Sequence, residues 1–234
     1  MDLNVISLKH VEKRFKNHSV IKDISLQINQ GEIFGLLGPS GSGKTTLIKM
    51  IVGIEKPSKG EIKVLDKKMP SFDILGKIGY MGQLDSLYED LTGMENLKYF
   101  GQLNNIKRRD IEGRINPIIE RLGLKEDIDK LVCKYSGGMK KRLSLALALI
   151  HNPSLLILDE PTVGIDPVLR KEIWNLFEDL KKIGTTLIIT THIMEEADRC
   201  ERICLIREGE ILSIGKTEDL KKEAKDGKLE NLFF

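Results

Sequence analysis

A glycine-rich stretch carries the clearest chemistry of the chain. It reads Gly38-Pro39-Ser40-Gly41-Ser42-Gly43-Lys44-Thr45-Thr46 and follows the apolar run 33–37. Glycines let a backbone curl until successive N–H groups point at one polyphosphate, and a following helix adds the partial positive charge of its N-terminus. In such a loop the lysine reaches the β- and γ-phosphates, and the hydroxyl after it ligates Mg²⁺. The stretch therefore predicts a polyphosphate site with Lys44 and Thr45 as its polar contacts.

Two carboxylates and an imidazole follow later apolar runs. Asp159 and Glu160 come directly after the run 155–158, and His192 follows the run 186–190. In open α/β sheets the carboxyl ends of the strands face the ligand crevice, so these groups are expected beside the glycine loop. Asp159 then holds Mg²⁺ together with Thr45, Glu160 polarises a water, and His192 hydrogen-bonds developing negative charge. The plain alternatives are an acidic turn and a polar strand end.

Three further features suit nucleotide chemistry but are ambiguous one by one. Gln83 follows a short predicted strand and could ligate Mg²⁺ or a water, and Phe15 could stack on adenine. Ser136-Gly137-Gly138 begins a predicted helix and could cover a nucleotide held by a second copy of the chain. An ordinary surface Gln, a core Phe and a simple turn are the respective alternatives.

The elements that must position these groups are read from hydrophobic periodicity. Alternation predicts half-buried strands, and continuous apolar runs predict strands of a buried parallel sheet. The alternating stretches are 4–8, 24–28 and 61–65, and the other predicted strands are 33–37, 77–81, 155–158, 185–190, 202–207 and 210–213.

Helical signals fill the interval from about 84 to 150. Thr92 and Glu95 have capping-box spacing, Pro117 falls inside the predicted helix 106–122, and Ser136 opens another. Asp166-Pro167 begins a helix that ends near Ile183, with Asp as the cap. A charged helix capped by Thr217 is expected within 216–230.

Composition narrows the class of protein. The 37 basic and 35 acidic residues give a net charge of +2, which argues against a nucleic-acid partner. No apolar leader opens the chain, and polar residues interrupt its richest apolar stretch, 143–158, so a cytoplasmic protein is expected. Cys133, Cys200 and Cys204 suggest reduced thiols, although the last two have the spacing of a shared helix face, which could hint at metal.

Taken together, these motifs resemble those of the ATP-binding cassette (ABC) ATPases. The resemblance covers about residues 4–215 and follows the family's order: glycine loop, Gln83, Ser136-Gly137-Gly138, 155–160, Asp166 and His192. It implies an α/β fold with a RecA-like P-loop NTPase core, an antiparallel β-subdomain and an α-helical subdomain inserted at about 84–150. The ATPase domain would span 1–215, followed by a short helix and apolar tail at 216–234.

The resemblance also implies a mechanism. Two cassettes would sandwich two ATP molecules, with the glycine loop of one facing Ser136-Gly137-Gly138 of the other. Glu160 would be the catalytic base, His192 the switch and Gln83 the sensor loop, while Asp166 would lie in a dimer-contact loop and Phe15 under the adenine. Tyr135, Met139 and Gly82 depart from the usual family residues, as does Thr162-Val163-Gly164-Ile165-Asp166.

Three features resemble the exporter branch that handles drugs, antibiotics or polysaccharides: Tyr135 with Met139, the segment Thr162-Val163-Gly164-Ile165-Asp166-Pro167, and the closing Leu229-Glu230-x-x-Phe. That branch implies an integral membrane permease docked on the helical lobe near 83–100, a second cassette chain, preferably identical, and a peripheral position on the cytoplasmic face of the membrane. An ABC ATPase of soluble machinery, such as iron–sulfur cluster assembly or cell division, is the alternative. A DNA-repair or chromosome-condensing ATPase would need a long coiled coil between Gln83 and Ser136, where only 52 residues lie.

Overall fold

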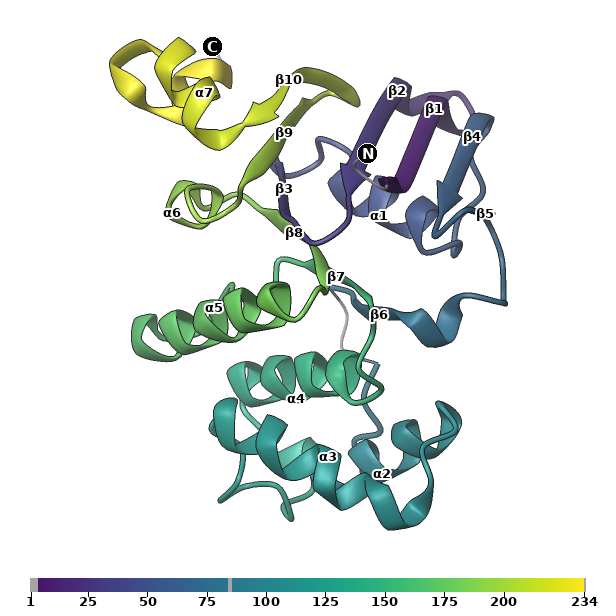
Figure 1. Cartoon of the computed structure of the whole chain (residues 1–234), viewed down its shortest axis with the longest axis vertical. Coiled ribbons are helices and arrows are strands. Elements are labelled where there is room, and N and C mark those ends of the chain that lie inside the picture. Colours follow the sequence, from purple (N-terminus) through teal and green to yellow (C-terminus); the bar gives the residue numbers. More distant parts are fainter. Residues whose placement is uncertain (1–3, 84–85, 234) are drawn as a thin grey trace.

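The computed structural model describes residues 4–83 and 86–233. The first residue of the predicted helical lobe, at 84, and the last residue of the predicted tail lie outside the described residues. The described chain forms two β-sheets, a helical lobe and a C-terminal helix (Figure 1).

The smaller sheet is antiparallel, as the resemblance to the ABC ATPases implies. Its order is β2-β1-β4-β5, from β1 (Asn4–Phe15), β2 (His18–Asn29), β4 (Lys59–Val64) and β5 (Lys67–Lys68). The first two strands are much longer than the predicted 4–8 and 24–28. The register of β1 against β2 shifts between Leu8 and Val11, and His10 has a φ of 48° there. This bulge breaks the alternation on which the shorter prediction depended.

The larger sheet carries the site. Its order is β10-β9-β3-β8-β7-β6, formed by β3 (Ile33–Leu37), β6 (Ile78–Met81), β7 (Leu155–Asp159), β8 (Thr186–Thr191), β9 (Arg202–Arg207) and β10 (Glu210–Lys216). Its strands run parallel except β10, which is antiparallel to β9. The carboxyl ends of β3, β8, β7 and β6 therefore meet at one edge of the sheet.

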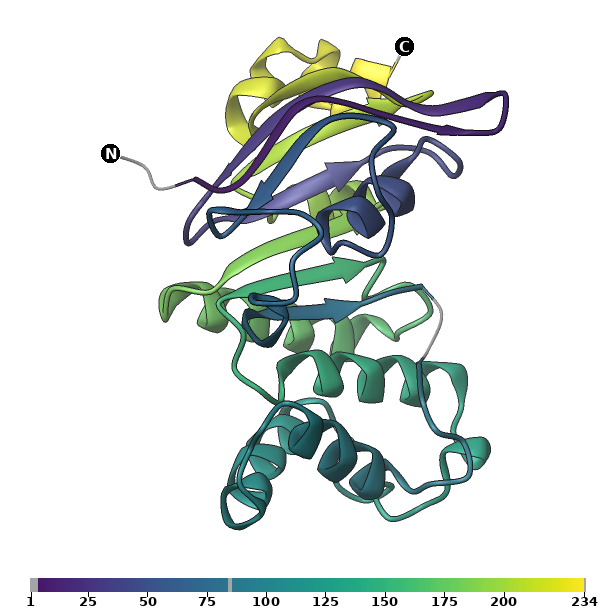
Figure 2. The same cartoon turned by 90° about the vertical axis from the view of Figure 1, so that its right-hand side faces the viewer.

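Both faces of this sheet are covered, which explains the continuous apolar runs of its strands. Leu155 and Ile157 pack into the core shared with the antiparallel sheet, whereas Leu156 and Leu158 pack toward the helical lobe. Helix α1 (Lys44–Ile51) lies between the two sheets (Figure 2). Helices α5 (Pro167–Lys182) and α6 (Met194–Ala197) contact β8 on the opposite face.

The helical lobe consists of α2 (Gly93–Leu103), α3 (Arg108–Arg121) and α4 (Gly137–Leu149), at the far end of the molecule from the antiparallel sheet (Figure 1). The capping box predicted at Thr92 and Glu95 is confirmed, since each side chain accepts a hydrogen bond from the other's backbone N–H. Short 3-10 turns complete the chain: η1 (Leu75–Lys77), η2 (Val132–Lys134), η3 (Lys225–Gly227) and η4 (Leu229–Phe233).

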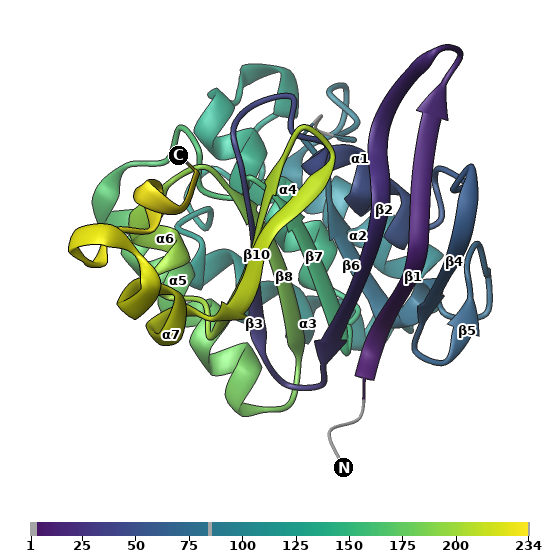
Figure 3. The same cartoon turned by 90° about the horizontal axis from the view of Figure 1, so that it is seen from above.

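The C-terminal helix α7 (Thr217–Glu223) lies beside β10, on the side away from β1 and β4 (Figure 3). The predicted cap was wrong: Lys216 occupies the cap position, and the Thr217 hydroxyl donates instead to the Cys200 carbonyl. Leu220 and Leu229 are buried in the main core, so this segment packs on the domain. Its separation from 1–215 as a distinct unit stays a prediction.

The two neighbouring cysteines lie differently from the sequence prediction. Cys200 and Cys204 do not share a helix face, because Cys204 lies on β9 and the two thiols point into different cores. Among the described residues no group of His, Cys, Asp or Glu side chains is arranged as a metal cluster. Within the same residues, no helix combines the length and apolar character needed to cross a membrane.

Candidate functional site

The glycine loop joins β3 to α1, as its sequence predicts. Gly43 is the N-cap of α1 with a φ of 105°, and Gly41 has a φ of 79°. A Cβ on Gly38 would lie 2.2 Å from the Ile206 carbonyl oxygen, so no larger residue fits there. The backbone therefore curls around a space to which a chain of bulkier residues could not conform.

Lys44 is buried at the base of this loop. Its Nζ donates to the carbonyl oxygens of Gly38 at 2.6 Å and Pro39 at 3.0 Å. Burial lowers the pKa of Lys44, while the negative charges of Glu160 and Asp159 act in the opposite direction. The ammonium is thus bound to the loop's own carbonyl oxygens, close enough to Glu160 and Asp159 for their charges to affect its pKa.

A cavity of about 370 Å³ opens above the loop. It is lined by Val20, Ser40, Gly41, Gly43, Lys44, Thr45, Thr46, Gln83 and Glu160. The cavity thus brings together the glycine loop, the end of β7 and the residue after β6, three segments that the sequence places far apart.

Asp159 ends β7 and is fully buried. Its Oδ1 accepts a 2.5 Å hydrogen bond from the Thr190 hydroxyl, whereas its Oδ2 has no hydrogen-bond partner among the described residues. The buried Ser42 hydroxyl of the loop is unpartnered in the same sense. Burial of a carboxylate oxygen without a hydrogen-bond donor costs free energy, and coordination of a hard divalent cation by that oxygen would offset the cost.

Glu160 turns away from the strand that precedes it. Its φ is 52°, and its backbone N–H is shared between the Thr190 carbonyl oxygen at 3.2 Å and the Thr190 hydroxyl at 3.0 Å. Its Oε1 lies 3.1 Å from Nδ1 of His192. The two predicted reacting residues, from the ends of β7 and β8, therefore contact one another at the edge of the cavity.

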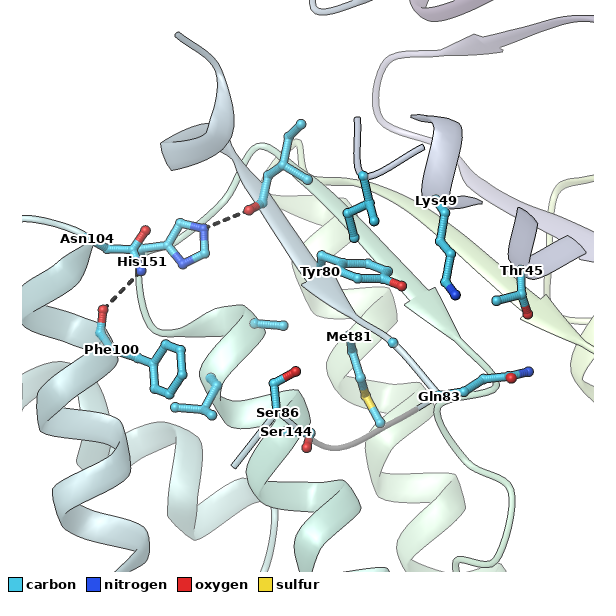
Figure 4. A pocket seen from close by; sticks show the side chains of 15 residues that line it. Thr45, Lys49, Tyr80, Met81, Gln83, Ser86, Phe100, Asn104, Ser144 and His151 are labelled. Atoms are coloured by element: carbon cyan, nitrogen blue, oxygen red, sulfur yellow. Dashed lines mark hydrogen bonds between the residues drawn. The ribbon is translucent and has the colours of Figure 1, made fainter. Parts of the chain in front are cut away.

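Gln83 links the cavity to a neighbouring groove of about 440 Å³. Both Gln83 and Thr45 line the two spaces, and α2 and α4 contribute the groove's far wall (Figure 4). His151 closes that wall by hydrogen-bonding the Ile78 carbonyl oxygen at 3.1 Å through Nε2. The position agrees with the prediction that Gln83 lies at the junction of the sheet and the helical lobe.

The helix tip at Ser136 belongs to another part of the surface. Ser136 is the N-cap of α4 and its hydroxyl accepts from the Met139 N–H at 3.3 Å. A Cβ on Gly138 would lie 3.7 Å from the Gly164 carbonyl oxygen, and the Lys141 Nζ donates to the Val163 carbonyl oxygen at 3.0 Å. The Ser136-Gly137-Gly138 tip therefore lies beside the segment that leads to Asp166, and neither is among the residues lining the cavity over the loop.

Three predicted residues have local roles in the structure. The Asp166 carboxylate caps α5 by accepting from the Leu169 N–H at 3.0 Å. Tyr135, which stands where the family usually has Leu, is buried in the lobe and donates to the Asp127 carbonyl oxygen at 2.8 Å. Phe15 is 43% exposed beneath the Lys13 ammonium, while Val20 on the same hairpin lines the cavity.

Sequence reasoning missed the threonines that hold the strand ends. Thr190 binds both Asp159 and the backbone of Glu160, and Thr191 is hydrogen-bonded to Glu196. Their signal was present, because two polar residues end an apolar strand where the reacting groups were expected. The geometry as a whole is that of a P-loop nucleoside triphosphatase.

Comparison with known proteins agrees with this class. The family model described as ABC transporter matches residues 21–163, and a model of an AAA domain matches residues 132–198. The chain is 41% identical over 221 residues to the Nod factor export ATP-binding protein I of Sinorhizobium fredii, covering 93% of the chain and 64% of that protein. The corresponding protein of Rhizobium johnstonii is 43% identical, with coverage of 93% and 71%. The chain thus spans about two thirds of the length of such relatives.

Solved structures have the same fold. The ATP-binding subunit of an ABC transporter superposes with a TM-score of 0.89 at 24% identity, covering 98% of both chains. The dimeric cassette MJ0796, in a post-hydrolysis state bound to ADP and Pi, gives a TM-score of 0.83 at 29% identity, covering 90% of this chain and 98% of its own. The chain belongs to the ABC transporter family, as an ATP-binding cassette that hydrolyses ATP. The predicted fold class is confirmed, and the comparisons give no support to the soluble-machine alternative.

Proposed function

We propose that this chain is the ATP-hydrolysing subunit of a membrane exporter and that it acts as a dimer of cassettes. The observation that carries the proposal is the division of its motifs between two surfaces. The glycine loop, Glu160 and Gln83 share one cavity, whereas the Ser136-Gly137-Gly138 tip lies elsewhere on the same chain. A second chain is the natural source of a helix N-terminus to close over the triphosphate.

Within one cavity the residues divide the work as follows. The backbone N–H groups of residues 38–46 and the Lys44 ammonium bind the phosphates, and Glu160, paired with His192, orients the attacking water. Thr45, Asp159 and Gln83 would hold Mg²⁺, which when bound neutralises charge on the phosphates. The unpartnered Oδ2 of Asp159 supports its part in this set. Phe15 would move over the adenine from its exposed position at the hairpin tip.

A homodimer is the simplest assembly because one chain carries every motif. In the closed dimer Ser136, Gly137 and Gly138 of one protomer cover the nucleotide of the other, and Asp166 lies at the contact between protomers. Solved cassettes of similar fold are described as dimeric, which supports this arrangement.

The permease is proposed to dock on the groove beside Gln83. Tyr88, Tyr99 and Phe100 form an aromatic cluster on the helical lobe, with ring centroids 5.2 to 6.0 Å apart, and Phe100 also lines the groove. Tyr88 and Tyr99 are 48% and 42% exposed, as expected of anchors for a partner. Such docking would hold the chain at the cytoplasmic face of the membrane through the permease, and the nearly balanced charge of the chain argues against a nucleic-acid partner.

Isolation of the chain from its native membrane with its partners tests this proposal. A multi-span membrane protein that co-purifies in detergent, and is lost when Tyr99→Asp and Phe100→Asp are combined, is the expected result. Recovery with a water-soluble partner instead would contradict the exporter role. For the dimer, Glu160→Gln with saturating ATP and Mg²⁺ should sediment at twice the monomer mass, and a persistent monomer would contradict the shared site.

A further inference from the structure

Glu196 is a buried carboxylate that the proposed catalytic roles do not use. It lies on the short helix α6 and is 2% exposed, although Glu195 beside it faces solvent. Carboxylates are rarely buried unless hydrogen bonds or charges compensate the loss of hydration. The groups that hydrogen-bond to the buried Glu196 carboxylate therefore indicate its role in the structure.

Both oxygens of Glu196 are bound by threonine hydroxyls from two different segments. The Thr162 hydroxyl donates to Oε1, and the Thr191 hydroxyl donates to Oε2 at 2.6 Å. The Thr191 oxygen also accepts from the Ile193 N–H at 3.0 Å, and its one hydrogen is available for Glu196. Both threonines are fully buried.

The two segments are the ones that matter for a closed dimer. Thr162 begins the segment that ends at Asp166, and Thr191 immediately precedes His192. Thr162 follows β7 and Thr191 is the last residue of β8, and the register between these neighbouring strands ends at Asp159 and Thr190. Beyond that point Glu160 contacts His192 directly, and the buried Glu196 hydrogen-bonds to both Thr162 and Thr191.

Cationic side chains share a cavity with Glu196. This cavity of about 350 Å³ beside α5 is lined by Glu196 together with Arg170, Lys171 and Arg199, and by Glu195 as a second carboxylate.

We propose that Glu196 is a positioning residue that couples the dimer-contact segment 162–166 to the switch residue His192. Movement of either segment breaks a buried charge-assisted hydrogen bond unless the other segment moves with it. Glu196 thereby couples two events: Asp166 contacts the partner chain at the same time as His192 approaches the γ-phosphate. This inference rests on the proposed roles of Asp166 and His192.

Thr162→Val and Thr191→Val test the coupling, because each keeps the shape of the threonine and removes one hydroxyl. We expect kcat for ATP hydrolysis to fall about 10-fold in each, with KM for ATP changed less than about 2-fold, since the glycine loop is untouched. The double variant should be no worse than the poorer single variant, because either loss alone disconnects the segments. Glu196→Gln should reproduce the fall, and Glu195→Gln, an equal charge change on the same helix, should leave kcat unchanged.

Two outcomes would overturn the inference. If Glu196 serves only stability, the losses in kcat will follow the losses in melting temperature and will multiply in the double variant. If kcat is unaffected in both Thr→Val variants while Glu160→Gln abolishes turnover, the coupling is absent although the catalytic site stands. Loss of the catalytic role itself would be distinguished by normal turnover in Glu160→Gln.

Discussion

At the scale of single residues, the backbone at Glu160 shows how the site is held. A glutamate with a φ of 52° occupies a region that residues with a Cβ rarely adopt, at a cost of about 1–3 kcal/mol. Thr190 offsets this cost, because its carbonyl oxygen and its hydroxyl oxygen both accept a hydrogen bond from the Glu160 N–H. The same hydroxyl donates to the Asp159 carboxylate, so one threonine holds both the last residue of β7 and the backbone of the residue after it.

Replacement of Glu160 by Gln is expected to preserve this backbone and to remove the base. Turnover should fall on the order of 10²-fold or more, because loss of a group that orients the attacking water acts on the transition state. Binding should persist, since the glycine loop and Lys44 are unchanged. Steady-state hydrolysis together with the ATP-dependent rise in melting temperature checks both parts. Turnover within a few-fold of the unmodified chain would contradict the role of Glu160.

The sequence predicts the positions of the proposed reacting residues better than those of the residues that support them. Lys44, Asp159 and Glu160 follow from a loop motif and from the rule that strand ends face the crevice. Glu196 could not be found this way, because one of its partners lies 34 residues away and an acidic pair on a helix normally indicates a solvated face. A hydrogen bond between residues far apart in the chain produces no periodic pattern and no fixed spacing that sequence analysis could detect.

At the scale of elements, local signals were reliable where the interaction is local. The Thr92 and Asp166 caps were predicted because side chain and backbone partner are three residues apart. The full length of β1 was not predicted, because its bulge depends on pairing with the partner strand β2. Thr217 looked like a cap yet bonds the Cys200 carbonyl, a contact made across the fold.

Thr92→Ala should lower the free energy of unfolding by about 1 kcal/mol, since it leaves the Glu95 N–H of α2 without its cap. Thr92→Ser keeps the accepting oxygen and should retain most of the stability. Urea denaturation of the three proteins, compared at equal m-values, measures the difference. Equal losses for Ala and Ser would assign the effect to the Thr methyl group and not to the cap.

His151, at the end of α4, should make stability depend on pH. Burial lowers its pKa below the ordinary value of 6.5, and the nearby Arg114 charge acts in the same direction, while the hydrogen bond to Ile78 opposes them. The folded protein then binds fewer protons than the unfolded chain as the pH falls below about 6.5, so stability declines with falling pH. His151→Gln should flatten the decline in melting temperature between about pH 7 and 5.5.

The exposed His18 offers the matched control for that measurement. His18→Gln removes an exposed imidazole and should leave the pH dependence of stability as it was. An unchanged slope in His151→Gln, or an equal flattening in both variants, would show that another group causes the decline.

At the scale of the whole molecule, the two halves of the proposed nucleotide site lie at separate places on one chain. One surface carries the cavity above the glycine loop, and another carries the Ser136 tip beside the segment 162–166. When two copies are related by a two-fold axis, the cavity of each chain can meet the Ser136 tip of the other, so that the dimer contains two equivalent sites. This arrangement makes each site depend on both chains, which a mixing experiment can measure.

Lys44→Ala disables the glycine loop, and Gly137→Asp disables the helix tip. The second change is mild within its own chain, because a Cβ at Gly137 meets no atom within 4 Å and an acidic residue suits the first turn of α4. In a closed dimer it puts a carboxylate against the partner's triphosphate. Each variant alone should be inactive, since neither homodimer contains an intact site.

A mixture of the two variants should regain activity, because a mixed dimer unites the intact loop of one chain with the intact tip of the other. With random pairing and independent sites, the equimolar mixture should reach about a quarter of the activity of the unmodified protein. Mixing Lys44→Ala with the double variant Lys44→Ala/Gly137→Asp provides the control, since no pairing restores a site there. If each chain hydrolysed ATP alone, or used its own Ser136 tip, the first mixture would stay as inactive as its components.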